Sequence, residues 1–180
     1  MTSPLEIDSR RLARQPGASL RIEAEVVPDP DIANDFLRVE PEPVVVDLLL
    51  ESVLDGILVT GSASPTTTGT CVRCLDDIRR PMDVTFRQFF TYPEVEPTDG
   101  GDEDEDVTPM TGPILDLRPA FRDATLLALP LSPTCRSDCP GLCATCGFRM
   151  ADDSEHGHER IDPRMAALAD LRVDVDSEGE

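Results

Sequence analysis

Lysine is absent from this sequence of 180 residues, so all 16 of its basic residues are arginine, against 36 acidic residues. The formal net charge is −20, and no basic footprint of the kind that nucleic-acid-binding proteins carry is visible. A chain this acidic repels polyphosphate and attracts basic surfaces. The charge therefore argues against nucleic acid as the general partner and favours a basic protein.

The usual catalytic motifs are also missing. The sequence contains no G-x-S-x-G, no H-E-x-x-H and, without lysine, no glycine-rich phosphate loop that ends in lysine. The only two histidines, His156 and His158, lie close to a group of cysteines, which leaves no free general base of the usual kind. We therefore expect no enzymatic activity and no small-molecule substrate.

Aromatic and long apolar segments are scarce. Tryptophan is absent, tyrosine occurs once, and hydrophobic residues make up 39% of the chain, which provides only a thin core. There is no continuous apolar run of about 18 residues and no basic-then-apolar signal pattern at the N-terminus. We therefore expect a soluble, cytoplasmic protein with no membrane partner. In that setting the six cysteines favour metal or redox chemistry over disulfides.

Hydrophobic periodicity predicts an α+β fold built mainly of antiparallel β-sheet. Four segments have the character of strands: 20–26, 44–50, 57–59 and 82–92. Two short helices are expected in the C-terminal part of the chain. One begins at Pro119 and ends before Pro130, and the other begins at Asp162, whose side chain is suited to cap a helix.

Composition predicts a single domain with less ordered flanks. The expected boundaries are an N-terminal arm at 1–18, a domain at 19–172 and an acidic tail at 173–180. Within the domain, the segment 94–112 has many carboxylates and no cation, which predicts a disordered acidic loop. The segment 133–160 is a loop rich in cysteine and histidine, and we expect it to bind metal.

The cysteines and histidines are the most informative residues. They occur as Cys71-x2-Cys74, as Cys135-x3-Cys139-x3-Cys143-x2-Cys146, and as His156 and His158. Zinc binds four sulfur or nitrogen ligands in a tetrahedron, and a two-residue spacer lets a tight turn present two sulfurs to one ion. We therefore expect these eight side chains to be the ligands of one or two zinc ions.

Two ligand pairings fit the spacing. In the first, Cys143 and Cys146 share one ion with the two histidines, while Cys71 and Cys74 share a second ion with the remaining two cysteines. In the second pairing, a single site uses both Cys-x2-Cys pairs. The histidines can also be interpreted as ordinary surface residues. The spacing alone leaves these alternatives open.

Two redox interpretations compete with a structural metal. A reactive dithiol normally lies at a helix N-terminus inside a βαβ unit, and neither Cys-x2-Cys pair has that context. The spacing Cys139-x3-Cys143-x2-Cys146 matches the iron–sulfur motif of radical enzymes that use S-adenosylmethionine. Those enzymes need a large barrel after the motif, and only about 34 residues follow it here. A structural metal therefore remains the preferred interpretation.

Six segments, in this order, carry a resemblance to a known family: Leu12–Gly17, Leu50–Gly61, Thr68–Leu75, Leu127–Pro130, Cys139–Gly147 and Ile161–Arg164. Together they resemble the bacterial YceD-like proteins associated with accumulation of 23S ribosomal RNA, in the form found in high-GC Gram-positive bacteria. The sequence departs from the family at His156 and His158, where Cys-x-Cys is expected in many relatives. Histidine is also a zinc ligand, so the departure is compatible with zinc and disfavours an iron–sulfur cluster.

The resemblance implies a non-enzymatic accessory protein of ribosome biogenesis that supports 23S ribosomal RNA accumulation. It also implies cysteine pairs at Cys71/Cys74 and Cys143/Cys146. Together with the acidic charge, it leads us to expect a basic ribosomal protein or the large-subunit ribosomal RNA precursor as partner. The alternative function is a redox-responsive thiol and zinc regulator, in which oxidation of the cysteines ejects the metal and exposes a binding face.

Overall fold

The structure is a computed structural model that describes residues 3–12, 14–94, 107–158 and 164. The chain forms two compact units, Met1–Cys139 and Pro140–Glu180, where the composition predicts one domain. All the strands and the helix that the structure describes belong to the first unit. No described helix has both the length and the apolar character needed to cross a membrane.

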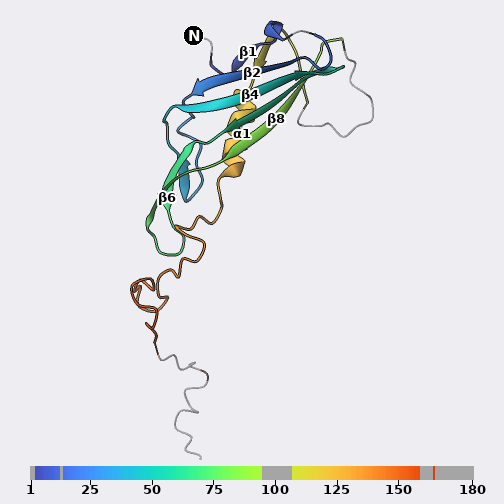
Figure 1. The fold of residues 1–180 in the computed structure, drawn as a ribbon. Helices are drawn as coiled ribbons and strands as arrows, with labels where there is room; N and C mark the ends of the chain where they lie inside the picture. The colour runs from blue at the N-terminus through green and yellow to red at the C-terminus, as the bar shows by residue number, and fades with distance from the viewer. Residues whose placement is uncertain (1–2, 13, 95–106, 159–163, 165–180) are drawn as a thin grey trace, which may run out of the picture. The chain divides into compact units, whose positions relative to one another are not determined.

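The main element of the first unit is a five-stranded sheet (Figure 1). Its strands, in spatial order, are β2 (Ser19–Val26), β4 (Val44–Ser52), β5 (Gly56–Ala63), β8 (Val84–Thr91) and β9 (Val107–Pro109). The first four pair antiparallel, whereas β9 runs parallel to β8. Alternate apolar side chains of this sheet pack onto one face, so the prediction of a mainly antiparallel β fold is confirmed.

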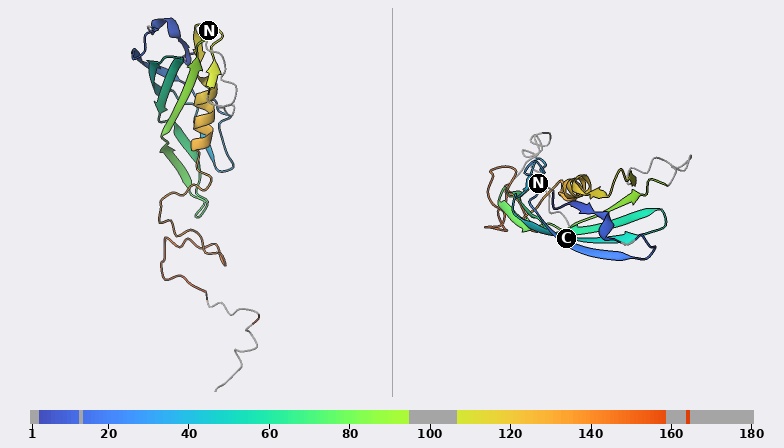
Figure 2. Two further views of the ribbon diagram at one scale, coloured as in Figure 1. Left: turned by 90° about the vertical axis from the view of Figure 1, so that its right-hand side faces the viewer. Right: turned by 90° about the horizontal axis from the view of Figure 1, so that it is seen from above.

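One helix, α1 (Arg118–Ala128), covers one face of the sheet and runs beside β8 (Figure 2). Pro119 lies in its first turn, where the missing N–H has no intrahelical partner to lose. Phe121 of the helix packs edge-on against Phe86 of β8, with ring centroids 6.2 Å apart. The helix predicted from Pro119 is therefore confirmed, whereas the one predicted from Asp162 lies outside the described residues.

The segment before β2 corrects the expectation of an N-terminal arm at 1–18. Strand β1 (Glu6–Asp8) pairs antiparallel with β10 (Ile114–Asp116), and a short 3-10 helix, η1 (Ser9–Arg11), follows β1. Three side chains of this segment are buried in the main hydrophobic core: Leu5, Ile7 and Leu12. A strand of three residues is too short to show periodicity, which is why the sequence pattern does not reveal it.

A smaller sheet extends the first unit. It has three antiparallel strands in the order β3 (Leu37–Val39), β6 (Thr66–Thr70) and β7 (Asp77–Pro81). Apolar periodicity in the sequence predicts none of these three strands. Strands β6 and β7 form a hairpin, and the connection between them carries Cys71 and Cys74. The smaller sheet therefore positions the first cysteine pair.

Strand β9 lies inside the segment 94–112, for which composition predicts an acidic disordered loop. Val107 and Thr108 pair with Phe89 and Phe90 of β8. The residues of β9 carry no carboxylate and include β-branched side chains, so they are suited to a strand. Residues 95–106 of the predicted loop lie outside the described residues, as does the predicted acidic tail at 173–180.

We predict that Gly69→Ala destabilises the smaller sheet. A Cβ at Gly69 in β6 would overlap the carbonyl oxygen of Phe36 and approach the side chain of Leu37, so the backbones of β3 and β6 would have to separate. Overpacking of this kind lowers the free energy of unfolding by about 1–3 kcal/mol. Urea unfolding followed by circular dichroism would measure the change.

The matched control is Gly112→Ala. A Cβ at Gly112 meets nothing within 4 Å, so this variant should be as stable as the parent or slightly more stable. Equal stability of the Gly69→Ala and Gly112→Ala variants would contradict the close approach of β3 and β6.

Candidate metal centre

Four cysteines of the first unit converge in the first cluster. Cys71 and Cys74 come from the connection between β6 and β7, and Cys135 and Cys139 come from the loop that follows α1. The sulfur atoms of Cys71 and Cys139 are 3.8 Å apart, and those of Cys74 and Cys135 are 3.6 Å apart. All four sulfurs lie within 4.8 Å of one another. The cluster thus joins the hairpin of the smaller sheet to the chain beyond the helix.

Hydrogen bonds hold the two halves of the first cluster together. The backbone N–H of Val72 donates to the carbonyl oxygen of Pro133 at 2.9 Å. The Arg73 guanidinium donates through Nη1 to the carbonyl oxygen of Cys139, also at 2.9 Å. Cys139 is only 3% exposed, so its carbonyl oxygen needs a hydrogen-bond donor from within the protein, and Arg73 provides it. Arg73 is a supporting residue that the spacing of the cysteines does not identify.

The second cluster consists of Cys143, Cys146, His156 and His158, all in the second unit. The sulfur of Cys146 lies 3.2 Å from Nε2 of His156 and 3.1 Å from Nε2 of His158. The ring of Phe148 stacks on His156 with a centroid distance of 4.3 Å and holds that imidazole in place. The four ligand atoms lie within 4.8 Å of one another. The second cluster is more open to solvent than the first.

The two Cys-x2-Cys turns have the same backbone geometry. In each turn, the residue after the second cysteine donates its N–H to the carbonyl of the first: Leu75 to Cys71 at 3.0 Å, and Gly147 to Cys143 at 2.8 Å. Both residues have a left-handed backbone, with φ of 63° at Leu75 and 74° at Gly147. Glycine adopts this conformation without a steric penalty, whereas leucine does not. The first turn is therefore strained at Leu75, and the second is not.

Backbone dipoles favour one thiolate in each cluster. Burial raises the pKa of Cys71, but hydrogen bonds from the backbone N–H groups of Cys74 and Cys135 outweigh that effect and help to lower it to about 6. In the second cluster, the backbone N–H of Thr145 makes the largest contribution to lowering the pKa of Cys143 to about 6. Each cluster therefore has one sulfur that is ready to act as a thiolate ligand near neutral pH.

The donor atoms fit a tetrahedral metal ion. A zinc–thiolate bond of about 2.3 Å gives a tetrahedron with sulfur–sulfur edges of about 3.8 Å, close to the two distances of the first cluster. These separations are far greater than the roughly 2.0 Å of a disulfide, and all six cysteines are free thiols. Sulfur and imidazole donors exclude a preference for calcium or magnesium, which take oxygen ligands. Both clusters could therefore hold a metal ion.

The geometry distinguishes between the pairings that the spacing leaves open. The structure brings Cys143 and Cys146 together with His156 and His158, as in the first pairing, and brings Cys71 and Cys74 together with Cys135 and Cys139. A single site that uses both Cys-x2-Cys pairs does not match this grouping. The imidazole rings of both histidines lie within hydrogen-bonding distance of the Cys146 sulfur, so they are not isolated surface residues.

Comparison with known proteins adds a family. The family model described as "Large ribosomal RNA subunit accumulation protein YceD" matches residues 59–172. An uncharacterized protein of Mycobacterium tuberculosis is 38% identical over 172 residues, which cover 95% of this chain and 83% of the relative. An uncharacterized protein of Mycobacterium leprae is 37% identical, with 95% and 79% covered. No solved structure matches.

We predict that the two clusters bind metal separately. Titration with Co²⁺, whose thiolate complexes absorb visible and near-ultraviolet light, should reach two ions per chain. Cys74→Ser should lose the ion of the first cluster and Cys146→Ser that of the second, because each removes one of four ligands. Each variant should therefore bind one ion. If either variant lost both ions, the clusters would not be independent.

We also predict opposite effects of substitutions at the two left-handed positions. Leu75→Gly removes a conformation that is unfavourable for leucine and should raise the free energy of unfolding of the first unit by up to about 1 kcal/mol. Gly147→Ala imposes the same strain on the second turn, where a Cβ meets no atom within 4 Å, so only the backbone is affected. It should weaken Co²⁺ binding by the second cluster about fivefold. A stabilising Gly147→Ala would contradict this account.

Proposed function

This chain belongs to the YceD family of large ribosomal RNA subunit accumulation proteins, and we propose that it is a zinc-stabilised accessory protein of large-subunit assembly that binds a basic ribosomal protein without catalysing a reaction. Family membership is the observation that carries the proposal, because it relates the chain to ribosomal RNA accumulation. The acidic charge and the cysteine clusters supply the physical details.

Zinc is the metal that suits both clusters. It accepts four thiolates or a mixture of thiolates and imidazoles in the same tetrahedral geometry, so one metal serves the first and the second cluster. When bound, zinc would supply charge neutralisation and a rigid crosslink. Structural zinc contributes an apparent free energy of about 10–16 kcal/mol in small peptides, which is large compared with what a thin core provides. The residues of this chain supply the ligands and the hydrogen bonds that orient them.

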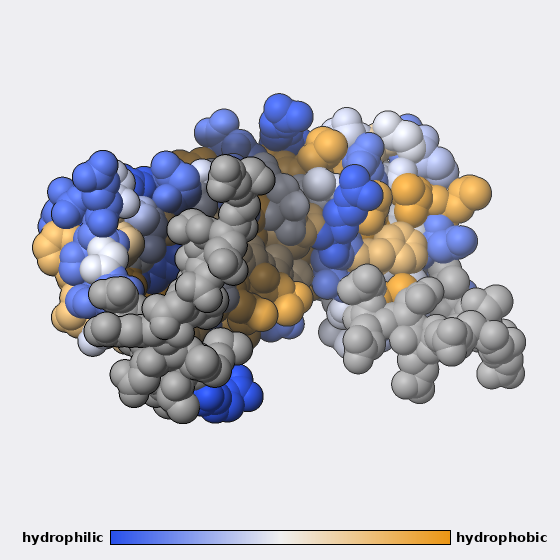
Figure 3. Space-filling model, turned by 90° about the horizontal axis from the view of Figure 1, so that it is seen from below, coloured by the Kyte–Doolittle hydropathy of each residue, from blue (hydrophilic) through white to orange (hydrophobic). Residues whose placement is uncertain are grey.

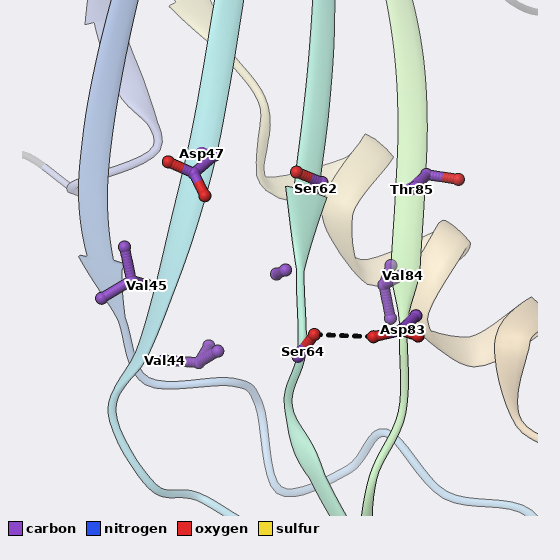
Figure 4. Close-up of a pocket in the computed structure, with 9 residues that line it drawn as sticks. Val44, Val45, Asp47, Ser62, Ser64, Asp83, Val84 and Thr85 are labelled. Atoms are coloured by element: carbon purple, nitrogen blue, oxygen red, sulfur yellow. Dashed lines mark hydrogen bonds between the residues drawn. The ribbon is translucent and has the colours of Figure 1, made fainter.

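The arrangement of charged side chains supports a basic protein as partner. On the solvent face of the five-stranded sheet, Glu23 of β2 lies directly opposite Asp47 of β4. Like charges at opposed positions of an antiparallel pair are destabilising unless a cation joins them. Beyond Asp47 the surface continues with Ser62 and Asp83, and Ser64 donates to Asp83 at 2.8 Å (Figure 4). This face favours arginine and lysine side chains of a partner.

The arginines offer less support for direct contact with RNA. Arg79 forms ion pairs with Glu40 at 2.7 Å and Glu42 at 3.1 Å. Arg73 is occupied by the carbonyl of Cys139. Cations that are already paired within the chain contribute less to phosphate binding, which depends on neutralising several phosphates at once. A ribosomal RNA precursor is therefore the less favoured partner.

Copurification tests the proposal. Tagged full-length protein should retain basic large-subunit ribosomal proteins at low salt and release them as salt rises, because the attraction is electrostatic. Treatment with ribonuclease should not change the result. Retention of ribosomal RNA after its proteins have been stripped would overturn the choice of partner. Release of zinc by mild peroxide, with a matching loss of partner binding, would favour the redox-responsive regulator instead.

A further inference from the structure

The second unit has no hydrophobic core among its described residues, 140–158 and 164. Leu142 and Met150 are half-buried, and Phe148 is 37% exposed. None of the groups of buried hydrophobic side chains in the described chain includes a residue of this unit. The space-filling view from below shows apolar residues at the surface among hydrophilic ones (Figure 3). Burial of apolar surface therefore contributes little to the stability of the described part of the second unit.

Backbone hydrogen bonds give the second unit a short hairpin. The N–H of Cys143 donates to the carbonyl oxygen of Phe148 at 2.8 Å, and the N–H of Met150 donates to that of Gly141 at 3.1 Å. Within residues 140–158 the structure has no helix and no strand longer than an isolated bridge. A single two-stranded hairpin is at best marginally stable in water. The hairpin therefore needs a further source of stability.

The ligand side chains join the histidine segment to this hairpin. His156 and His158 follow Cys146 by 10 and 12 residues, and the ring nitrogens of both approach its sulfur. Cys146 and His158 are exposed and His156 is half-buried, so water competes with these contacts. An ion bound by all four ligands would supply a crosslink that solvent-exposed hydrogen bonds do not.

The first unit has stability of its own. Its main core contains Val46, Leu50 and Val59 of β4 and β5, each with no exposed surface. No candidate metal ligand belongs to this core. The main sheet should therefore stay folded without a metal ion.

We propose that the second unit is a metal-dependent folding switch. Residues 140–158 are ordered when the second cluster holds a zinc ion and unfold when the ion is removed, while the main sheet stays folded. When ligands converge only in the folded state, the free energy of folding depends on the concentration of free metal. The order of the second unit thus follows the zinc available to the protein. This inference goes beyond the proposed function, in which zinc has a structural role alone.

The experiment compares zinc-loaded full-length protein with metal-free protein prepared with a chelator under reducing conditions. Removing zinc should speed amide hydrogen exchange at Cys143, Gly147 and Met150 about tenfold or more, because their N–H groups lose their hydrogen bonds. Exchange at Val46–Leu50 of β4 should stay slow, and added zinc should restore protection of the hairpin. Unchanged exchange in the hairpin would overturn the switch. Equal acceleration in β4 would overturn the independence of the second unit.

Two cysteine variants show which cluster controls the second unit. Cys146→Ser removes the sulfur that both histidines approach, so the hairpin should exchange rapidly even with excess zinc. Cys74→Ser makes the same change in the first cluster and should leave the hairpin protected by zinc. Equal exchange of the hairpin in the two variants would overturn control by the second cluster.

A phenylalanine pair tests whether folding and zinc binding are coupled. Phe148 is not a ligand, but its ring stacks on His156, so Phe148→Ala should weaken zinc binding by the second cluster about fivefold. Excess zinc should restore protection of the hairpin in this variant. Phe36→Ala removes a ring of similar exposure, 40%, from the first unit and should leave that affinity unchanged. Equal zinc affinity of the two variants would contradict the coupling. These measurements do not involve a partner, so they test the switch independently of the proposed function.

Discussion

The smaller sheet, formed by β3, β6 and β7, depends on the convergence of four thiols at its hairpin. The smaller sheet has little apolar material of its own. One small group of buried side chains contains Cys71, Ile78 and Cys139. A second small group includes Leu37 and Val39 of β3. A core of this size offers little hydrophobic free energy, so a metal ion held by the four sulfurs would contribute most of the attachment between the hairpin and the chain beyond α1.

Much of the main sheet is predictable from sequence, and the smaller sheet is not. The strands around residues 44–50 and the helix from Pro119 are long enough for apolar periodicity to emerge. Strands β3 and β1 have three residues each, and β6 is a run of threonine and glycine that resembles a polar connection. The candidate ligands can be recognised from their spacing, whereas their grouping depends on contacts between distant segments, which spacing does not encode.

The ion pairs that the arginines form affect the surface charge of the molecule. Several are held by nearby carboxylates, including Arg10 by Asp8 and Arg118 by Asp116. These exposed pairs add little to stability, but each carboxylate neutralises a positive charge that the arginine would otherwise present to a partner. The 36 acidic residues far outnumber the 16 arginines, so carboxylates set the sign of the surface potential.

The two clusters also differ in how much chain they enclose. The ligands of the second span about 16 residues, from Cys143 to His158, whereas those of the first span about 69, from Cys71 to Cys139. Loop-closure entropy separates the two by only about 1 kcal/mol, but the longer ring also brings together the β6–β7 connection and the loop after α1. An ion in the second cluster would thus join residues that are near neighbours in the sequence, whereas an ion in the first would join segments that are far apart in it.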